Sequence, residues 1–166
     1  MSDAAESMKA ESPFWRFSLR FYARPGISAA CLVLQDEAGA DVNLLLFLLF
    51  LADSGIAIAS EDVRRFDGAV KAWREAVVEP LRALRRRLKS GIEPVPPGDS
   101  EIFRNQIKRA ELEAERIEQG ILETLVPASG PALSRKDAAR RNIAAYEPLL
   151  KPLPSAAIAA VLAAFD

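Results

Sequence analysis

The residues best suited to chemistry in this sequence are three carboxylates and an amide that lie close together, at Asp36, Glu37, Asp41 and Asn43. Oxygen ligands of these kinds hold hard cations such as Ca²⁺ in proteins. A structural explanation competes with a cation site, because Asp41 also stands where the N-cap of a helix is expected. We favour the structural explanation, since the spacing lacks the alternating ligands of a calcium-binding loop. We therefore predict no bound metal and no cofactor.

The same segment could instead form a polar site for a small molecule. Gln35, Asp36, Asp41 and Asn43 make a polar corner between two predicted helices. The amide of Asn43, in the first turn of an apolar helix, needs a hydrogen-bond partner there. If the protein is an enzyme or binds a cofactor, we expect its pocket at residues 36–43, against Trp15.

Histidine is absent from all 166 residues, which removes histidine triads, histidine general bases and Glu-x-x-His metal sites. The eight glycines form no glycine-rich phosphate loop. The single cysteine, Cys31, has no histidine to activate it and lies among apolar residues, so we predict a buried and unreactive thiol. The sequence nominates no catalytic residue and favours a protein that is not an enzyme.

A basic segment is the strongest functional feature of the sequence. Two predicted antiparallel helices bring eight cationic side chains toward one end, namely Arg82, Arg85, Arg86, Arg87, Lys89, Arg104, Lys108 and Arg109. Such a run is often only a solvated helix face. Because the net charge of the chain is −1, an attraction to acidic partners would have to come from a local patch such as this one.

The element that must position these groups is an apolar run from Leu44 to Ala52. A helix that is apolar on every face lies in a core or in a membrane. A membrane-spanning helix needs about 20 apolar residues, and this run is far shorter. The sequence therefore predicts a short buried helix over about residues 42–52, with its N-cap at Asp41 and the preceding helix closed by Gly39.

The remaining chain reads as helices, and no strand alternation or internal repeat is present. Apolar residues at helical spacing predict a long antiparallel hairpin over about residues 61–90 and 100–126, which Pro80 should bend or split. Ser60 and Ser100 are expected to cap the two arms, and Ser134 with Asp137 resembles a capping box. The predicted fold class is an all-α bundle of about six helices.

Composition bounds the organisation of the chain. Half of the residues are apolar and 27% are charged, which is ordinary globular usage. Residues 1–11 are polar and are expected to form a disordered tail, with a single helical domain over residues 12–166. One cysteine cannot form an internal disulfide, which predicts a reducing, cytoplasmic compartment.

Several stretches resemble a bacterial family of short all-helical proteins known only as a domain of unknown function. The resemblance rests on Phe14 and Trp15, on residues 22–26 and 31–32, on residues 35–47, on residues 79–84 and on residues 111–116. It covers roughly residues 14–125. The resemblance implies an all-helical fold and no particular activity, and it carries over no catalytic or binding residue.

Three functions from different classes are consistent with these features. The leading hypothesis is a non-enzymatic helical adaptor that binds a protein partner or an acidic surface through the basic hairpin tip. The second is a small-molecule or cofactor-binding enzyme with its pocket at residues 36–43. The third is a peripheral binder of anionic lipid or nucleic acid, although the tip lacks the interleaved aromatic residues that stack on single strands.

Overall fold

The computed structural model describes residues 12–125, 127–128, 130 and 132–166, and the described chain is helical with no strand. The expected tail at residues 1–11 lies outside the described residues. In chain order the helices are α2 (Pro13–Tyr22), α3 (Ile27–Ala38), α4 (Val42–Asp53), α5 (Ser60–Trp73), α6 (Glu79–Leu88), α7 (Pro97–Glu123), α8 (Arg135–Tyr146) and α9 (Ser155–Ala163). A π-helical segment, Arg74–Val78, joins α5 to α6, and a 3₁₀ turn, Glu147–Leu149, follows α8. The predicted all-α bundle is confirmed.

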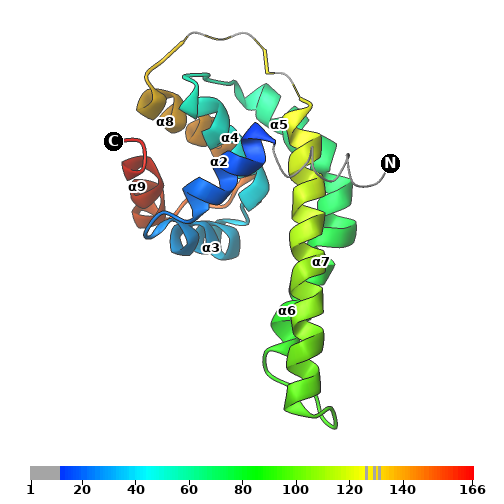
Figure 1. Cartoon of the computed structure of the whole chain (residues 1–166). Coiled ribbons are helices and arrows are strands. Elements are labelled where there is room, and N and C mark those ends of the chain that lie inside the picture. Colours follow the sequence, from blue (N-terminus) through cyan, green and yellow to red (C-terminus); the bar gives the residue numbers. More distant parts are fainter. Residues whose placement is uncertain (1–11, 126, 129, 131) are drawn as a thin grey trace.

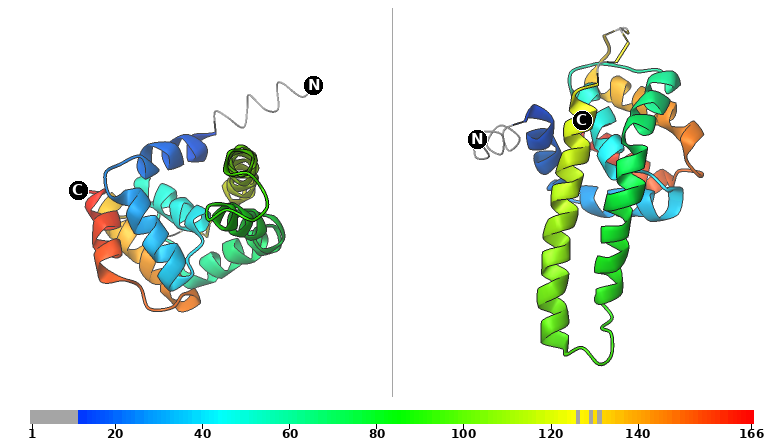
Figure 2. Two further views of the ribbon diagram at one scale, coloured as in Figure 1. Left: turned by 90° about the horizontal axis from the view of Figure 1, so that it is seen from below. Right: turned by 90° about the vertical axis from the view of Figure 1, so that its right-hand side faces the viewer.

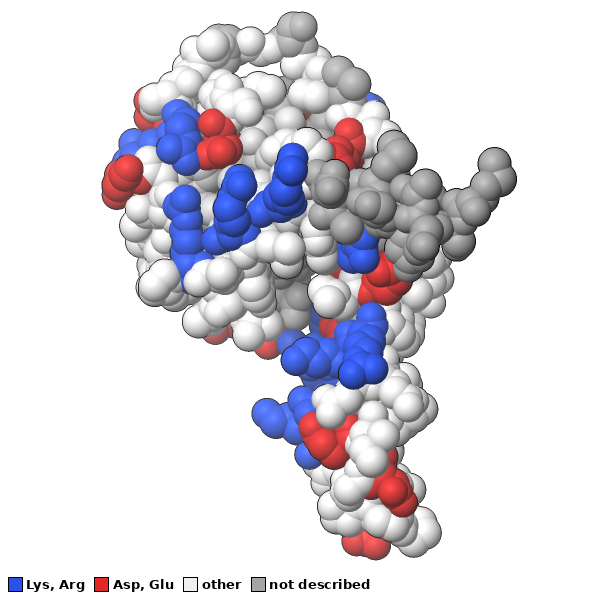
Figure 3. All heavy atoms as spheres, viewed as in Figure 1, with Lys and Arg blue, Asp and Glu red and all other residues white. Residues whose placement is uncertain are grey.

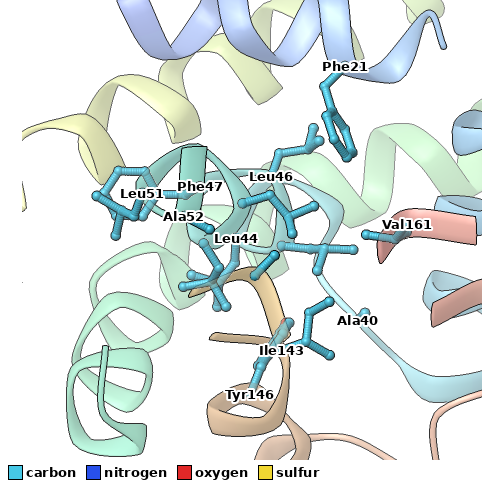
Figure 4. Close-up of a cluster of buried hydrophobic side chains, with 14 of the residues drawn as sticks. Phe21, Ala40, Leu44, Leu46, Phe47, Leu51, Ala52, Ile143, Tyr146 and Val161 are labelled. Atoms are coloured by element: carbon cyan, nitrogen blue, oxygen red, sulfur yellow. The ribbon is translucent and has the colours of Figure 1, made fainter. Parts of the chain in front are cut away.

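The centre of the fold is α4, as its apolar sequence predicts. Every residue from Asn43 to Leu49 is buried, and so are Leu51 and Ala52. The helix packs against α8, α7, α2 and α3 (Figure 1). The ring of Phe47 lies 5.2 Å from that of Phe14 and 5.4 Å from that of Phe66. In Figure 4 the side chain of Leu44 in α4 lies toward Ile143 and Tyr146 of α8, whereas Phe47 and Leu51 are drawn farther from them. The helix is therefore surrounded by other elements rather than laid on a surface.

Most of the predicted helix ends are confirmed, and two caps are wrong. The side chains of Ser12, Asp41 and Ser134 accept hydrogen bonds from backbone amides in the first turns of α2, α4 and α8. Ser60 is instead the first residue of α5, whose N-cap is Ala59. Ser100 lies inside α7, because Pro97 begins that helix three residues earlier, as suits a residue with fixed φ and no amide hydrogen.

Pro80 does not interrupt the helical backbone that runs from α5 into α6. A π-helical turn precedes it, in which the amide of Glu79 donates to the carbonyl of Arg74 five residues back. Pro80 then stands in the first turn of α6, where a missing amide hydrogen costs little. The extra residue of the π-helical turn also rotates the buried face of the helix. Val78 is therefore buried, whereas regular α-helical spacing would have placed Val77 at that position.

Helices α6 and α7 form the predicted antiparallel hairpin, and it extends away from the other helices. We call residues 79–110 the projecting hairpin, and the remaining helices with the C-terminal half of α7 the body (Figures 1 and 2). No apolar side chain of residues 79–110 is buried, so the projecting hairpin adds nothing to the hydrophobic core. The far end of the hairpin is therefore held by the contacts between its own two arms.

Candidate functional site

Asp41 is the central residue of the corner between α3 and α4. One oxygen of the Asp41 carboxylate accepts the amide of Asn43 at 2.9 Å, which is the expected N-cap. The other accepts a hydrogen bond from Arg74 at 2.9 Å, and the backbone amide of Asp41 donates to the hydroxyl of Tyr146 at 3.0 Å. Three structural contacts thus occupy Asp41.

Arg74 links this corner to α5. It pairs with Asp41 at 2.9 Å and with Asp67 at 2.8 Å, and its side chain is only 13% exposed. Burial alone would lower the pKa of Arg74, but the hydrogen bonds and charges of the two carboxylates raise it overall. The guanidinium is therefore a fixed positive charge beneath α4. The π-helical turn begins at this residue.

A chain of buried polar side chains continues from Asn43 into α7. The amide nitrogen of Asn43 donates to Glu118 at 3.0 Å, and its oxygen accepts from the amide of Gln119 at 3.0 Å. The oxygen of Gln119 accepts the hydroxyl of Ser18 at 3.0 Å. The amide of Asn43 thus finds the partner that its position required.

Glu118 is the most unusual member of this chain, because it is fully buried. No donor among the described residues reaches its Oε1, and a protonated Glu118 side chain would donate to the carboxylate of Asp41. Burial, and next the charge of Asp41, raise the pKa of Glu118 well above its usual range. We therefore expect a neutral, protonated side chain at neutral pH.

The carboxylates that suggested a cation site do not converge. Asp36 is exposed and pairs with Arg86 at 2.8 Å, and this hydrogen bond is the main cause that lowers the pKa of Asp36. Glu37 is exposed, whereas Asp41 points to Arg74. Among the described residues, no group of three or more acidic, cysteine or histidine side chains could hold a metal ion. Cys31 is fully buried, and burial raises the pKa of its thiol to about 11.

A cavity of about 400 Å³ lies beside the corner, between the body and the start of the hairpin. Its apolar lining comes from α2, α3, α4 and α7 and consists of Trp15, Leu19, Leu32, Val42, Leu46 and Leu112. Its uncharged polar lining consists of Ser18, Tyr22, Gln35, Asn43 and Gln119. Of the four residues predicted to form a polar corner site, Gln35 and Asn43 thus line the cavity, whereas Asp36 and Asp41 do not.

The hairpin supplies a charged wall to this cavity. Arg82 donates to Glu111 at 3.2 Å and to Glu115 at 2.9 Å, and Arg85 forms a two-point contact with Glu111. Glu111 is 5% exposed, so these are largely desolvated ion pairs. Lys108 completes the wall and has no ion pair with any described residue.

The eight cations predicted to form one patch are divided by the structure. Arg82 and Arg85 belong to the cavity wall and pair with Glu111. Arg86 pairs with Asp36, and Arg104 pairs with Glu101 of its own helix. The other four, which have no ion pair with a described residue, are Arg87, Lys89, Lys108 and Arg109. In the view of Figure 3, basic side chains gather where the hairpin leaves the body and acidic ones lie toward its far end, so the clustering is not at the tip itself.

The far end of the hairpin carries exposed apolar residues instead. Ile102 is 63% exposed and Phe103 is 48% exposed, and Ile92 and Val95 of the connecting loop are also exposed. We call these four residues the apolar tip. Just behind it, Ser100 Oγ and Arg104 Nε are buried without a hydrogen-bond partner. The helical spacing of apolar residues in the second arm includes Phe103, but this end of the stripe is exposed and is not packed against the core.

Sequence reasoning missed several residues of the buried polar network and of the cavity wall. Arg74 and Glu118 belong to the network, Glu111 and Gln119 line the cavity, and none of the four was predicted as a site residue. One signal was available, because Glu111, Glu118 and the buried Leu122 recur at intervals of seven and four residues and so share a helix face. A face that combines acids with a leucine would have suggested buried acids paired with the nearby arginines.

The fold and this site define a class of all-helical proteins with an enclosed polar network and a projecting hairpin. The chain belongs to the family described as "Protein of unknown function (DUF2390)", which matches residues 13–122. The match spans the corner, the cavity and the whole hairpin. No curated protein and no solved structure matches the chain. No helix among the described residues is both long and apolar enough to cross a membrane.

Proposed function

We propose that the protein is a non-enzymatic interaction protein that binds a protein partner through the projecting hairpin. The observation that carries this proposal is the apolar tip, which exposes Ile102, Phe103, Ile92 and Val95 at the end of a hairpin that contributes nothing to the core. Exposed apolar residues gathered in one place are typical of surfaces that bind another protein. Folding of the body does not explain them.

Charge around the apolar tip indicates what kind of surface it fits. Glu93, Asp99 and Glu101 lie beside the tip, whereas Arg87, Lys108 and Arg109 lie closer to the body along the two arms. A complementary partner has an apolar groove with basic residues at its deep end and acidic residues at its mouth. Of the basic residues proposed as partner-binding from the sequence, Arg87, Lys108 and Arg109 then act as the rim of the contact, and the apolar tip is its centre.

This charge order favours a protein over an anionic lipid surface or a nucleic acid. The three carboxylates would meet an anionic surface first and would be repelled by it. Phe103 is the only aromatic residue of the tip, which leaves little for bases to stack on. The buried Cys31 fits a reducing, cytoplasmic compartment, where we also place the partner.

A site-specific photo-crosslinking experiment tests the proposal. A photoreactive residue is placed at Phe103 in living cells, and a matched one is placed at Leu149, a similarly exposed apolar residue of the body. We expect one discrete crosslinked protein from position 103 and none from position 149. The purified crosslinked protein should then bind the wild-type chain, and Phe103→Ser should weaken that binding about tenfold or more, as expected for a central apolar contact.

Two outcomes would contradict the proposal. One is that the purified partner binds Phe103→Ser and the wild type equally. The other is that no protein crosslinks at position 103 while the wild-type chain binds phosphatidylglycerol vesicles, or a duplex DNA, with an affinity that falls as salt rises. That second result would favour the peripheral binder of anionic lipid or nucleic acid.

A further inference from the structure

The cavity between the body and the hairpin has the size and lining of a ligand site, and no role for it follows from the hairpin proposal. Its volume of about 400 Å³ lies within the range of small-molecule pockets, roughly 300 to 1,000 Å³. Leu19, Leu32 and Leu112 are each about half exposed although they line the cavity, so apolar surface is left uncovered at its mouth. Covering that surface would stabilise a bound molecule.

One side of the cavity is a rigid row of hydrogen-bonding groups. Ser18, Gln119 and Asn43 are each about 5% exposed or less, and they are joined to one another by bonds of 3.0 Å. The amide nitrogen of Gln119 carries two hydrogens and donates only one of them to Asn43. The second hydrogen is left for a ligand. Because the row is held by Glu118 at its far end, its donors are fixed in direction.

The hairpin side of the cavity carries an excess of one positive charge. Its cations are Arg82, Arg85 and Lys108, and its carboxylates are those of Glu111 and Glu115. The two arginines are engaged by the two carboxylates, which leaves the ammonium of Lys108 without a counter-ion. Burial is the largest cause that raises the pKa of Glu115, and its hydrogen bond with Arg82 lowers it.

We propose that this cavity binds a mainly apolar monocarboxylic acid. The apolar body of the ligand lies against Trp15, Leu19 and Leu112, and its single carboxylate meets the ammonium of Lys108. One negative charge matches the one unpaired cation of the wall. A dianion would bring the ligand into conflict with Glu111 and Glu115, and a cationic ligand would be repelled by Lys108.

Calorimetric titration with three probes of one chain length tests this proposal. The probes are decanoate, decanol and decylammonium, which share the apolar body and differ in charge. We expect decanoate to bind about tenfold more tightly than decanol, as a charge-assisted contact predicts, and decylammonium to bind least. Absence of decanoate binding, or equal binding of decanoate and decanol, would overturn the proposal.

Matched variants locate the binding within the cavity. Lys108→Met keeps the side-chain stem and removes the charge, so decanoate should lose about tenfold in affinity while decanol is unaffected. Arg109→Met, the neighbouring exposed cation outside the cavity lining, should change neither. Leu112→Asp puts a carboxylate at the mouth and should abolish decanoate binding. All three positions are exposed, so circular dichroism should show unchanged folding.

The same titrations separate this site from the apolar tip. Phe103→Ser, which should weaken partner binding, lies away from the cavity lining and should leave decanoate binding unchanged. If decanoate binding falls in Phe103→Ser and persists in Lys108→Met, the acid binds the tip and the cavity proposal fails. The proposed partner contact would be unaffected by that failure.

Discussion

Asp41 illustrates how a residue that suggests chemistry can be occupied by structure. Its type and position admitted either a cation ligand or a helix cap. The structure gives it a cap bond to Asn43, an ion pair with Arg74 and a backbone bond to Tyr146. The cap could be predicted because it depends on neighbours in sequence. The contacts with Arg74 and Tyr146 could not, because those residues lie 33 and 105 positions away.

Glu118 yields a prediction about pH. Burial and the charge of Asp41 raise its pKa, so the folded protein holds a proton that the unfolded chain releases above its ordinary pKa of about 4.3. Unfolding then releases a proton, and this residue makes the free energy of unfolding fall as pH rises, by at most about 1.4 kcal/mol per pH unit.

Glu118→Gln should remove that contribution, because a neutral amide of the same shape has no proton to lose. We expect urea unfolding of the variant to depend less steeply on pH than that of the wild type between about pH 5 and about pH 8. The stability difference should favour the variant increasingly toward the alkaline end. Parallel curves for the two proteins would mean that Glu118 is ionised in the fold, contrary to the expectation from its burial.

At the scale of elements, local pattern predicted α4 and the hairpin well. The uninterrupted apolar run from Leu44 to Ala52 leaves little choice of structure, and the stripes of the two arms are long enough to define helices. The π-helical turn before Pro80 could not be predicted, because a bend, a break and a wider turn all satisfy the proline. Packing of Val78 and the placement of Arg74 decide among them.

The surrounded position of α4 makes a sharp stability prediction. Phe47→Asp places an unpaired carboxylate among Phe14 and Phe66, and it should cost about 4 kcal/mol or more, enough to unfold many domains. Leu149→Asp adds the same charge at an exposed apolar position and should change stability by less than about 1 kcal/mol. Thermal unfolding followed by circular dichroism measures both. A normal melting temperature for Phe47→Asp would contradict the buried position of this helix.

At the scale of the whole molecule, the sequence identified the cationic residues but not their division. Which face of α7 turns inward depends on α2, α4 and α6 together, and a single-helix period cannot supply that information. The cavity has the same origin, since its lining comes from four helices and the hairpin wall. The sequence therefore predicted that Arg82 and Arg85 could bind a partner. In the structure, Glu111 and Glu115 form ion pairs with these two arginines.

This division predicts opposite outcomes for one substitution made two residues apart. Arg85→Glu places a carboxylate against Glu111, whose side chain is only 7% exposed, so it leaves a buried charge repelled rather than paired. We expect it to lower the free energy of unfolding by about 2 kcal/mol or more. Arg87→Glu reverses an exposed charge with no ion pair to a described residue, and it should change stability by no more than about 1 kcal/mol.

Binding should change in the reverse order of stability. Arg87→Glu should weaken binding of the partner crosslinked at position 103, and the effect should shrink as salt rises, because exposed charges are screened. Urea titrations measure the stability of the two variants, and partner titrations at two salt concentrations measure their binding. If Arg87→Glu binds the partner as the wild type does, the free cations of the hairpin are a solvated face and only the apolar tip supports the contact. If Arg85→Glu is as stable as the wild type, the hairpin wall of the cavity is not held by these ion pairs.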